Sequence, residues 1–155
     1  MAVTAFWYVK AFLSFFNKEA DFDTDTIKMG LTTNSYTPNQ DDHQYYDVSI
    51  SNEVAAGNGY STGGYTLANK TIGRTLNVVK LDNTVDPNWT TGAGETLTAR
   101  RAFSYDSSPG SNKPLMTWVD FGQDESASNG GTFTIVLDAG GLATITPTDA
   151  TGFPA

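Results

Sequence analysis

Short segments with the period of a β-strand dominate this sequence from residue 26 onward. Ile27, Met29 and Leu31 alternate with Lys28 and Gly30, and a period of two places one face of a strand against a core. Clusters of Gly, Asn, Asp and Pro separate such segments, and no helical pattern intervenes. The pattern predicts strands at 26–33, 46–54, 75–81, 96–105, 115–121, 132–137 and 142–146, a short strand at Trp89, and a hairpin connection at 138–141. Such spacing favours an all-β fold, an antiparallel β-sandwich for which a jelly roll is one arrangement.

The stretch 5–16 departs from this pattern. Phe6, Val9, Leu13 and Phe16 recur at helical spacing, so the sequence predicts one short N-terminal helix over 5–16. Few polar residues interrupt it, and a helix that is apolar nearly all round is usually buried on several sides. Its burial partner is either the sheet of its own domain or a neighbouring subunit.

Length and charge limit the classes of protein that remain. The 155 residues suit a single domain over 1–155. The chain has a net charge of -8, and its nine Lys and Arg residues are scattered and form no basic stripe. Nucleic acid is therefore not an expected partner. The apolar N-terminal run has no basic leader, and it is shorter than the roughly 18–20 residues that a helix needs to span a bilayer. We therefore expect neither a signal peptide nor a membrane partner.

The candidate metal sites in the sequence are weak. Asp21, Asp23 and Asp25 alternate as at the start of a calcium loop, but Thr26 and Thr32 stand where that loop needs a glycine and a carboxylate. A second acidic loop holds Asp41, Asp42, His43 and Asp47 with no spacing that enforces a geometry, and the chain has no cysteine for thiolate sites. We predict no metal ion and no cofactor.

Catalytic motifs are equally sparse. The glycines of 57–64 lack the following helix of a phosphate-binding loop, so they are interpreted as turn residues. The chain has one histidine and no GxSxG motif, so nucleophilic catalysis by serine is poorly supported. A glycosidase could use two of the carboxylates, but in an acidic chain such pairs arise by chance. Trp7, Trp89 and Trp118 could line a sugar platform, although tryptophans in strands more often fill a core. We expect a protein that is not an enzyme, with a carbohydrate-binding module or hydrolase as an alternative.

Several motifs resemble a family of small virion proteins of tailed bacteriophages. They are DTIKMGL at 25–31, HQYYDVSISNEV at 43–54 and GNGYSTGGYTL at 57–67. The likeness continues more weakly through Trp89, TARRAFSYDSS at 98–108, LMTWVDFG at 115–122 and GTFTIVLDAGGLATIT at 131–146. The resemblance implies a capsid decoration, or cement, protein that is made in the bacterial cytoplasm and binds the outside of the virion. Its implied partner is the major capsid protein, with a trimer on the capsid as one possible homo-oligomer.

A decoration protein would work by interfacial burial and not by chemistry. On that hypothesis Phe6, Trp7, Phe12 and Phe16 are buried against the shell, and Asp41, Asp42 and His43 make contacts at the rim. The alternative within the virion is a minor structural or host-contact protein of the tail or neck. Copy number per particle separates these two locations.

Overall fold

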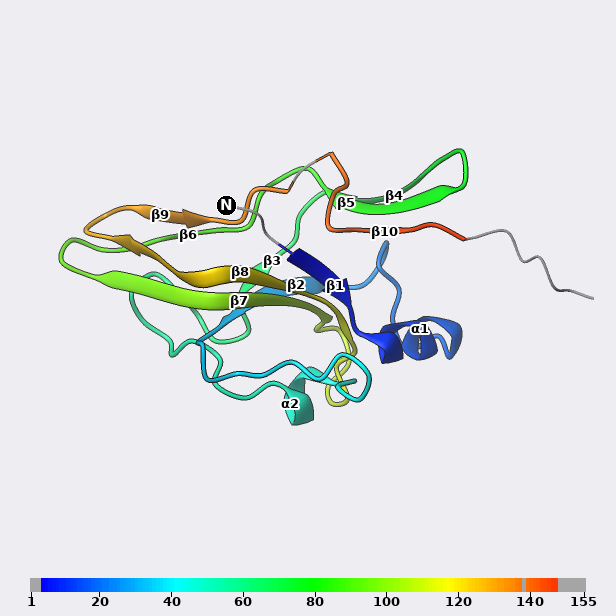
Figure 1. The fold of residues 1–155 in the computed structure, drawn as a ribbon, viewed down its shortest axis with the longest axis horizontal. Coiled ribbons are helices and arrows are strands. Elements are labelled where there is room, and N and C mark those ends of the chain that lie inside the picture. The colour runs from blue at the N-terminus through cyan, green and yellow to red at the C-terminus, as the bar shows by residue number, and fades with distance from the viewer. Residues whose placement is uncertain (1–3, 138, 148–155) are drawn as a thin grey trace, which may run out of the picture.

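The computed structural model describes residues 4–137 and 139–147 and shows an all-β sandwich with antiparallel sheets and two short helices (Figure 1). The elements in chain order are β1 (Thr4–Trp7), α1 (Val9–Phe16), β2 (Ile27–Thr32), α2 (Tyr46–Ser49), β3 (Tyr65–Thr66), β4 (Lys70–Thr75), β5 (Val78–Asn83), β6 (Asn88–Thr90), β7 (Thr96–Asp106), β8 (Leu115–Ser128), β9 (Thr132–Thr134) and β10 (Ala143–Ile145). The predicted fold class is confirmed.

The long strands β7 and β8 form the centre of the largest sheet. Five strands lie in the order β1-β8-β7-β2-β3, and two smaller sheets have the orders β10-β5-β4 and β6-β9. Every pairing between these strands is antiparallel. The smaller sheets lie along one side of the five-stranded sheet, and α2 lies on its other side (Figure 1).

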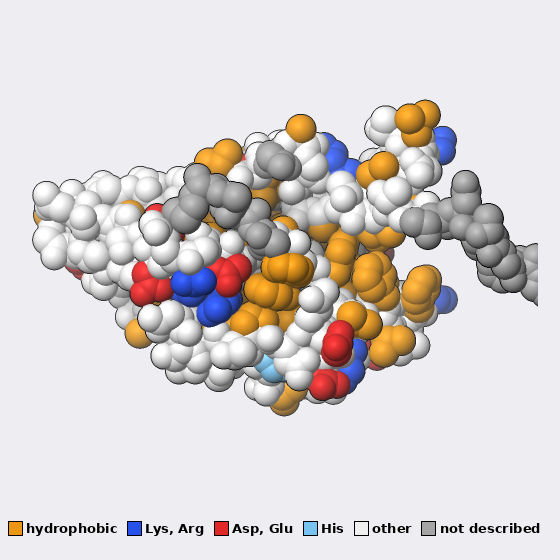
Figure 2. Space-filling model, in the orientation of Figure 1, with side chains coloured by type: hydrophobic (Ala, Val, Ile, Leu, Met, Phe, Trp, Pro, Cys, Tyr) orange, Lys and Arg blue, Asp and Glu red, His pale blue; other side chains and the backbone are white. Residues whose placement is uncertain are grey.

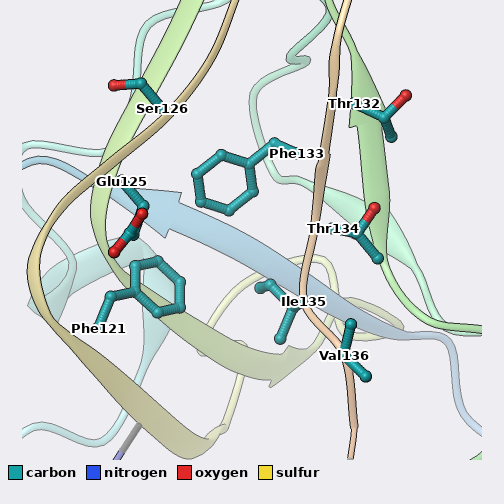
Figure 3. A pocket seen from close by; sticks show the side chains of 8 residues that line it. All are labelled: Phe121, Glu125, Ser126, Thr132, Phe133, Thr134, Ile135 and Val136. Atoms are coloured by element: carbon teal, nitrogen blue, oxygen red, sulfur yellow. The ribbon is translucent and has the colours of Figure 1, made fainter. Parts of the chain in front are cut away.

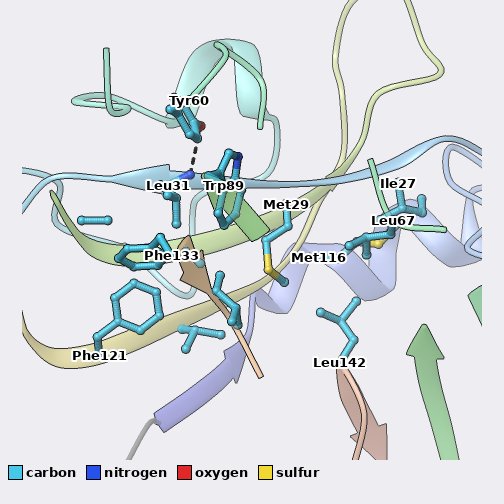
Figure 4. Close-up of a cluster of buried hydrophobic side chains, with 14 of the residues drawn as sticks. Ile27, Met29, Leu31, Tyr60, Leu67, Trp89, Met116, Phe121, Phe133 and Leu142 are labelled. Atoms are coloured by element: carbon cyan, nitrogen blue, oxygen red, sulfur yellow. Dashed lines mark hydrogen bonds between the residues drawn. The ribbon is translucent and has the colours of Figure 1, made fainter. Parts of the chain in front are cut away.

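Both faces of the five-stranded sheet are buried. On the side of the smaller sheets, the alternating Ile27, Met29 and Leu31 of β2 pack with Trp89 and Phe133 (Figure 4). The opposite side carries a second cluster made by Tyr8, Ala11, Phe103, Tyr105 and Leu115. The strand predicted at 26–33 is therefore confirmed together with its core-facing residues.

Gly30 has a packing role on that opposite face. A Cβ atom there would lie 2.4 Å from the Phe103 ring, so the absence of a side chain lets this ring cross β2. Gly30 and Phe103 are register partners in the β2–β7 pairing. A glycine inside a strand often marks such a close approach.

The N-terminal helix is shorter than predicted. It begins at Val9, and the preceding Thr4–Trp7 pairs as β1 with β8, where Phe6 is opposite Trp118. A run of apolar residues this short satisfies the period of a strand as well as that of a helix. The free edge of β8 decides between them, because it offers backbone hydrogen bonds that only an extended segment can use.

Three further predictions are wrong in detail. The segment 46–54 contains the one-turn helix α2 in place of a strand, and Asp47 there accepts backbone N–H groups from Asn112 and Lys113. The segment 75–81 contains the turn of a hairpin, since β4 ends at Thr75 and β5 begins at Val78. The strands at 132–134 and 143–145 belong to different sheets, so no hairpin joins them; Asp138 lies outside the described residues. For the segment 46–54, the bonds of Asp47 to a distant loop override the local pattern.

The later strands agree better with the sequence. β7 covers the predicted 96–105, β6 contains Trp89, and β8 covers 115–121 but continues to Ser128. The glycine-rich 57–64 is a loop, as predicted, and Gly57, Gly59, Gly63 and Gly64 all have positive φ. Tyr60, within this loop, is buried.

Gly64 is the glycine at which a side chain should be tolerated least. Its φ is +79°, and a Cβ atom would lie 2.0 Å from the Met29 carbonyl oxygen of β2. Gly94 is a matched control, because its φ is +76° but nothing lies within 4 Å. We expect Gly94→Ala to lower the free energy of unfolding by about 1–2 kcal/mol, because the only cost is that of holding alanine in a left-handed backbone conformation. Gly64→Ala should cost more than about 3 kcal/mol, because backbone must also move. Urea denaturation of both variants tests this; equal losses would contradict it.

Candidate interaction surface

The structure brings the N-terminal aromatic segment and the acidic loop together. The Val9 N–H donates to the Gln40 carbonyl at 2.9 Å, and Lys10 Nζ donates to the Asp42 carbonyl at 3.0 Å. Lys10 Nζ also lies 3.6 Å from Asp42 Oδ1. We call the resulting surface the docking face; it comprises Phe6, Val9, Phe12, Leu13, Phe16, Asp41 and Asp42. Figure 2 shows hydrophobic side chains gathered over β1 and α1, with acidic and basic side chains and the histidine beside them.

Helix α1 buries one face and exposes an apolar stripe. Ala11 and Ser14 are buried toward the sheet. Val9, Leu13 and Phe16 are 49%, 52% and 83% exposed. Their spacing of four and then three residues aligns them on one side of the helix. The helix thus packs on its own sheet and also leaves a hydrophobic face free, so both burial partners considered from the sequence stay relevant.

The predicted aromatic residues differ in how freely they can meet a partner. Trp7 packs against Phe12 and Phe15 at centroid distances of 5.1 and 6.2 Å, and its Nε1 donates to the Thr144 carbonyl at 3.0 Å. Phe6 stacks on Trp118 at 4.3 Å. Trp7 therefore holds α1 against β10. Phe6 and Phe12 are half-buried, and Phe16 is the most accessible of the four.

The acidic loop is shaped by Asn39. Its Oδ1 accepts the backbone N–H groups of Asp41 at 3.2 Å and of Asp42 at 3.1 Å. This turn is of the kind that Asn side chains favour. Both aspartates are exposed, and the contact of Asp42 with Lys10 places this end of the loop beside the start of α1.

His43 is tied into the protein interior. The Tyr36 hydroxyl lies 2.8 Å from Nδ1, and the Asn39 backbone N–H donates to the same atom at 3.3 Å. Because a backbone N–H can only donate, Nδ1 is the acceptor, and in the neutral ring Nε2 carries the proton. Tyr36 in turn bonds the buried Tyr8 hydroxyl at 2.8 Å. His43 therefore braces the acidic loop against the residue between β1 and α1.

A tyrosine cluster around Glu53 was missed by the sequence analysis. Glu53 Oε2 accepts the Tyr46 hydroxyl at 2.7 Å, while Oε1 accepts the Tyr60 hydroxyl and the Gly63 N–H, both at 2.6 Å. Burial raises the pKa of the Tyr60 hydroxyl, and the Glu53 carboxylate raises it further. The carboxylate holds the glycine-rich loop on the sheet. The sequence signal that could have indicated this cluster was Tyr60, a tyrosine inside the glycine-rich segment 57–64.

The structure does not assemble the other candidate sites, namely the acidic metal sites and the tryptophan platform, from the described residues. Within the described residues, no group of three His, Asp or Glu side chains could hold a metal ion. Asp21 Oδ1 accepts the N–H groups of Asp23 and Thr24, which makes a local turn. Trp89 lies in the core, so Trp7, Trp89 and Trp118 do not form one sugar platform.

An open cleft of about 500 Å³ lies between the end of β8 and the segment that follows it. Phe121 and Phe133 pack at a centroid distance of 5.8 Å on its inner side (Figure 3). Among the described residues that line it, Glu125 is the one carboxylate. Glycoside hydrolysis by the usual mechanism needs two carboxylates across the substrate, and the described lining residues supply one.

No helix in the part of the chain that the structure describes has both the length and the apolar character needed to cross a membrane. The chain matches no protein-family model, no curated protein and no solved structure.

The hydrogen bonds to His43 predict a pH dependence of stability. Burial lowers the pKa of His43 below its ordinary 6.5, because the charged ring loses hydration there; the carboxylate of Asp42 opposes this shift and Lys10 adds to it. The unfolded chain therefore takes up this proton at higher pH than the folded chain. Its contribution to stability is complete above about pH 6.5 and decreases as the pH falls below that value.

Thermal unfolding of the wild type and of His43→Gln between about pH 8 and pH 5 tests this dependence. We expect the wild type to be more stable at high pH and its advantage to shrink toward low pH, since all other groups titrate alike in both proteins. An advantage that grows toward low pH would contradict the assignment of Nδ1 as acceptor.

Proposed function

We propose that this protein is a structural component of a tailed-bacteriophage virion, a capsid decoration protein that attaches to the outer shell and stabilises contacts between major capsid subunits. The observation that carries the proposal is the exposed apolar stripe of α1 beside exposed aspartates. The geometry supports docking on a protein surface, and the sequence motifs at 25–31, 43–54 and 57–67 supply the expectation that this surface is a capsid.

The stripe is suited to attachment by burial. Full burial of an exposed apolar side chain contributes roughly 1.5–3 kcal/mol, so covering Phe16 would approach this range, while Val9 and Leu13, which are already half-buried, would each contribute about half of it. Exposed charges at the border of an apolar patch match the usual arrangement of an interface, with a hydrophobic centre and a polar rim. Asp41 and Asp42 favour a basic rim on the partner, because opposite charges guide encounter and fix orientation.

Repetition on a symmetric shell would strengthen such a contact. A trimer presents three docking faces at once, so weak single contacts add up to strong attachment. The net charge of -8 would keep free copies apart in solution before they bind. Neither step needs catalysis or a cofactor.

Copy number in purified particles tests the location. The amount of this chain relative to the major capsid protein, measured by quantitative mass spectrometry, should be near one or a simple fraction such as a third. A handful of copies per particle would instead favour the tail or neck. Absence from particles would overturn the virion proposal.

Two substitutions on the stripe should weaken attachment without unfolding the protein. We expect Leu13→Ser with Phe16→Ser to reduce binding to particles that lack the protein by at least about tenfold, because interface residues of this type can each contribute more than 1 kcal/mol. Val136→Ser is the matched control, since Val136 is apolar and 76% exposed but lies outside the docking face. Sedimentation of particles with added protein measures the retained fraction, and circular dichroism monitors the fold. Equal retention of both variants would place the contact elsewhere.

A further inference from the structure

The hairpin of β4 and β5 carries a second surface, separate from the docking face. It projects at the same end of the molecule as α1 (Figure 1). β5 lies between β4 and β10, so β4 is an edge strand. Residues 71–77 are all exposed, including Ile72 at 51% and Leu76 at 82%. Such an edge offers a row of backbone groups to an incoming strand.

The register identifies which residues of β4 face outward. Thr75 and Val78 flank a two-residue turn, and in such a hairpin the flanking pair exchanges backbone hydrogen bonds, as does every second pair beyond it. Thr71 and Gly73 therefore bond to β5, while Ile72 and Arg74 direct their N–H and C=O groups to the free edge. The other side of the sheet agrees, because Leu81, opposite Ile72, uses its carbonyl to accept the Leu142 N–H at 2.9 Å.

The charge on this edge is opposite to that of the whole chain. Lys70 and Arg74 lie on β4 and no carboxylate does, whereas the chain carries a net charge of -8. Lys80 on β5 pairs with Asp82 at 2.8 Å. Within the described residues, neither Lys70 nor Arg74 makes an ion pair. Lys70, Ile72 and Arg74 project to the same face, because side chains alternate along a strand.

A second copy of this chain is a poor occupant. If two β4 strands paired antiparallel with full overlap about Ile72, Lys70 of each would stand opposite Arg74 of the other. Like charges directly opposite each other destabilise a strand pair. Lysines on edges are a known means of preventing such self-association.

We propose that the free edge of β4 binds an extended acidic segment of a partner protein as an added β-strand. Backbone hydrogen bonds to Ile72 and Arg74 would supply affinity. Carboxylates at alternate positions of that segment would meet Lys70 and Arg74, which sets the preference for acidic partners. This contact is independent of the docking face and of the proposed function.

Short synthetic peptides test the proposal on the full chain. The probe alternates Glu with Val, and a peptide that alternates Lys with Val is its charge control. A third peptide repeats the acidic sequence with methyl groups on alternate backbone nitrogens, which prevents strand pairing but keeps the side chains. Fluorescence anisotropy should show that, of the three peptides, the unmethylated acidic one binds, and that added salt weakens this binding.

Amide hydrogen exchange locates the contact. At a peptide concentration ten times Kd, exchange at Ile72 and Arg74 should slow about tenfold, because only the free chain exchanges. Thr71 and Gly73, which already bond to β5, should change little. Equal binding of acidic and basic peptides, binding of the methylated peptide, or no binding of any peptide would overturn the proposal.

A substitution in β4 tests the same contact from the side of the protein. Ile72→Pro removes one outward N–H, a position at which an edge strand tolerates proline, and it should abolish peptide binding. Ile72→Thr keeps the N–H and should bind as the wild type does. If circular dichroism shows that the proline variant is unfolded, the methylated peptide decides the outcome.

Discussion

The antiparallel pairing of β7 with β8 is the constraint on which the rest of the structure depends. β1 pairs on the outer side of β8 and β2 on the outer side of β7, so this pair positions both the N-terminal segment and the core strand β2. Inside the pair, the buried Ser104 and Thr117 hydroxyls bond at 2.6 Å, and the Thr117 N–H donates to Ser104 Oγ at 3.1 Å. These bonds satisfy polar groups where the ladder shifts register between Phe103 and Tyr105.

A second irregularity in the same ladder gathers charge near the docking face. The register shifts between Ala99 and Arg101, and a bulge allows neighbouring residues to reach one side. Arg100 Nε and Arg101 Nε lie 2.9 and 3.2 Å from the two oxygens of Asp120, which follows the residues of β8 that pair with Phe6 and Ala5. Arg101 also donates to the Tyr36 carbonyl at 2.6 Å. The bulge thus joins the sheet to the loop that carries Tyr36, His43 and the acidic residues.

The two proposed contact surfaces differ in chemistry. The docking face is an apolar stripe with aspartates at its border, and it would bind by burying side chains. The edge of β4 carries the basic side chains of Lys70 and Arg74 on either side of Ile72, and it would bind through its backbone. A protein with both could attach to one partner through α1 while β4 holds a flexible segment of another.

The alternation of Ile27, Met29 and Leu31, the apolar character of 5–16 and the turn residues of 57–64 by themselves determined an all-β fold with a short helix and a glycine loop. These features are local: a period of two, a helical spacing or a residue tolerant of positive φ acts within a few neighbours. The sequence also pointed to Phe16, Asp41 and Asp42 as accessible residues. It could not assign His43 its internal role, because that depends on Tyr36 and Tyr8.

Tertiary structure alone decided where strands paired and which apolar residues stayed exposed. Thr4–Trp7 is extended because β8 offers an edge, 46–49 is helical because Asp47 binds the chain at 112–113, and Glu53 accepts the hydroxyl groups of both Tyr46 and Tyr60. Val9 and Leu13 are exposed because the sheet covers only the opposite side of α1. The pairing of β1 and the bonds of Asp47 depend on residues distant in sequence, whose hydrogen bonds and contacts outweigh the small local preferences of the chain.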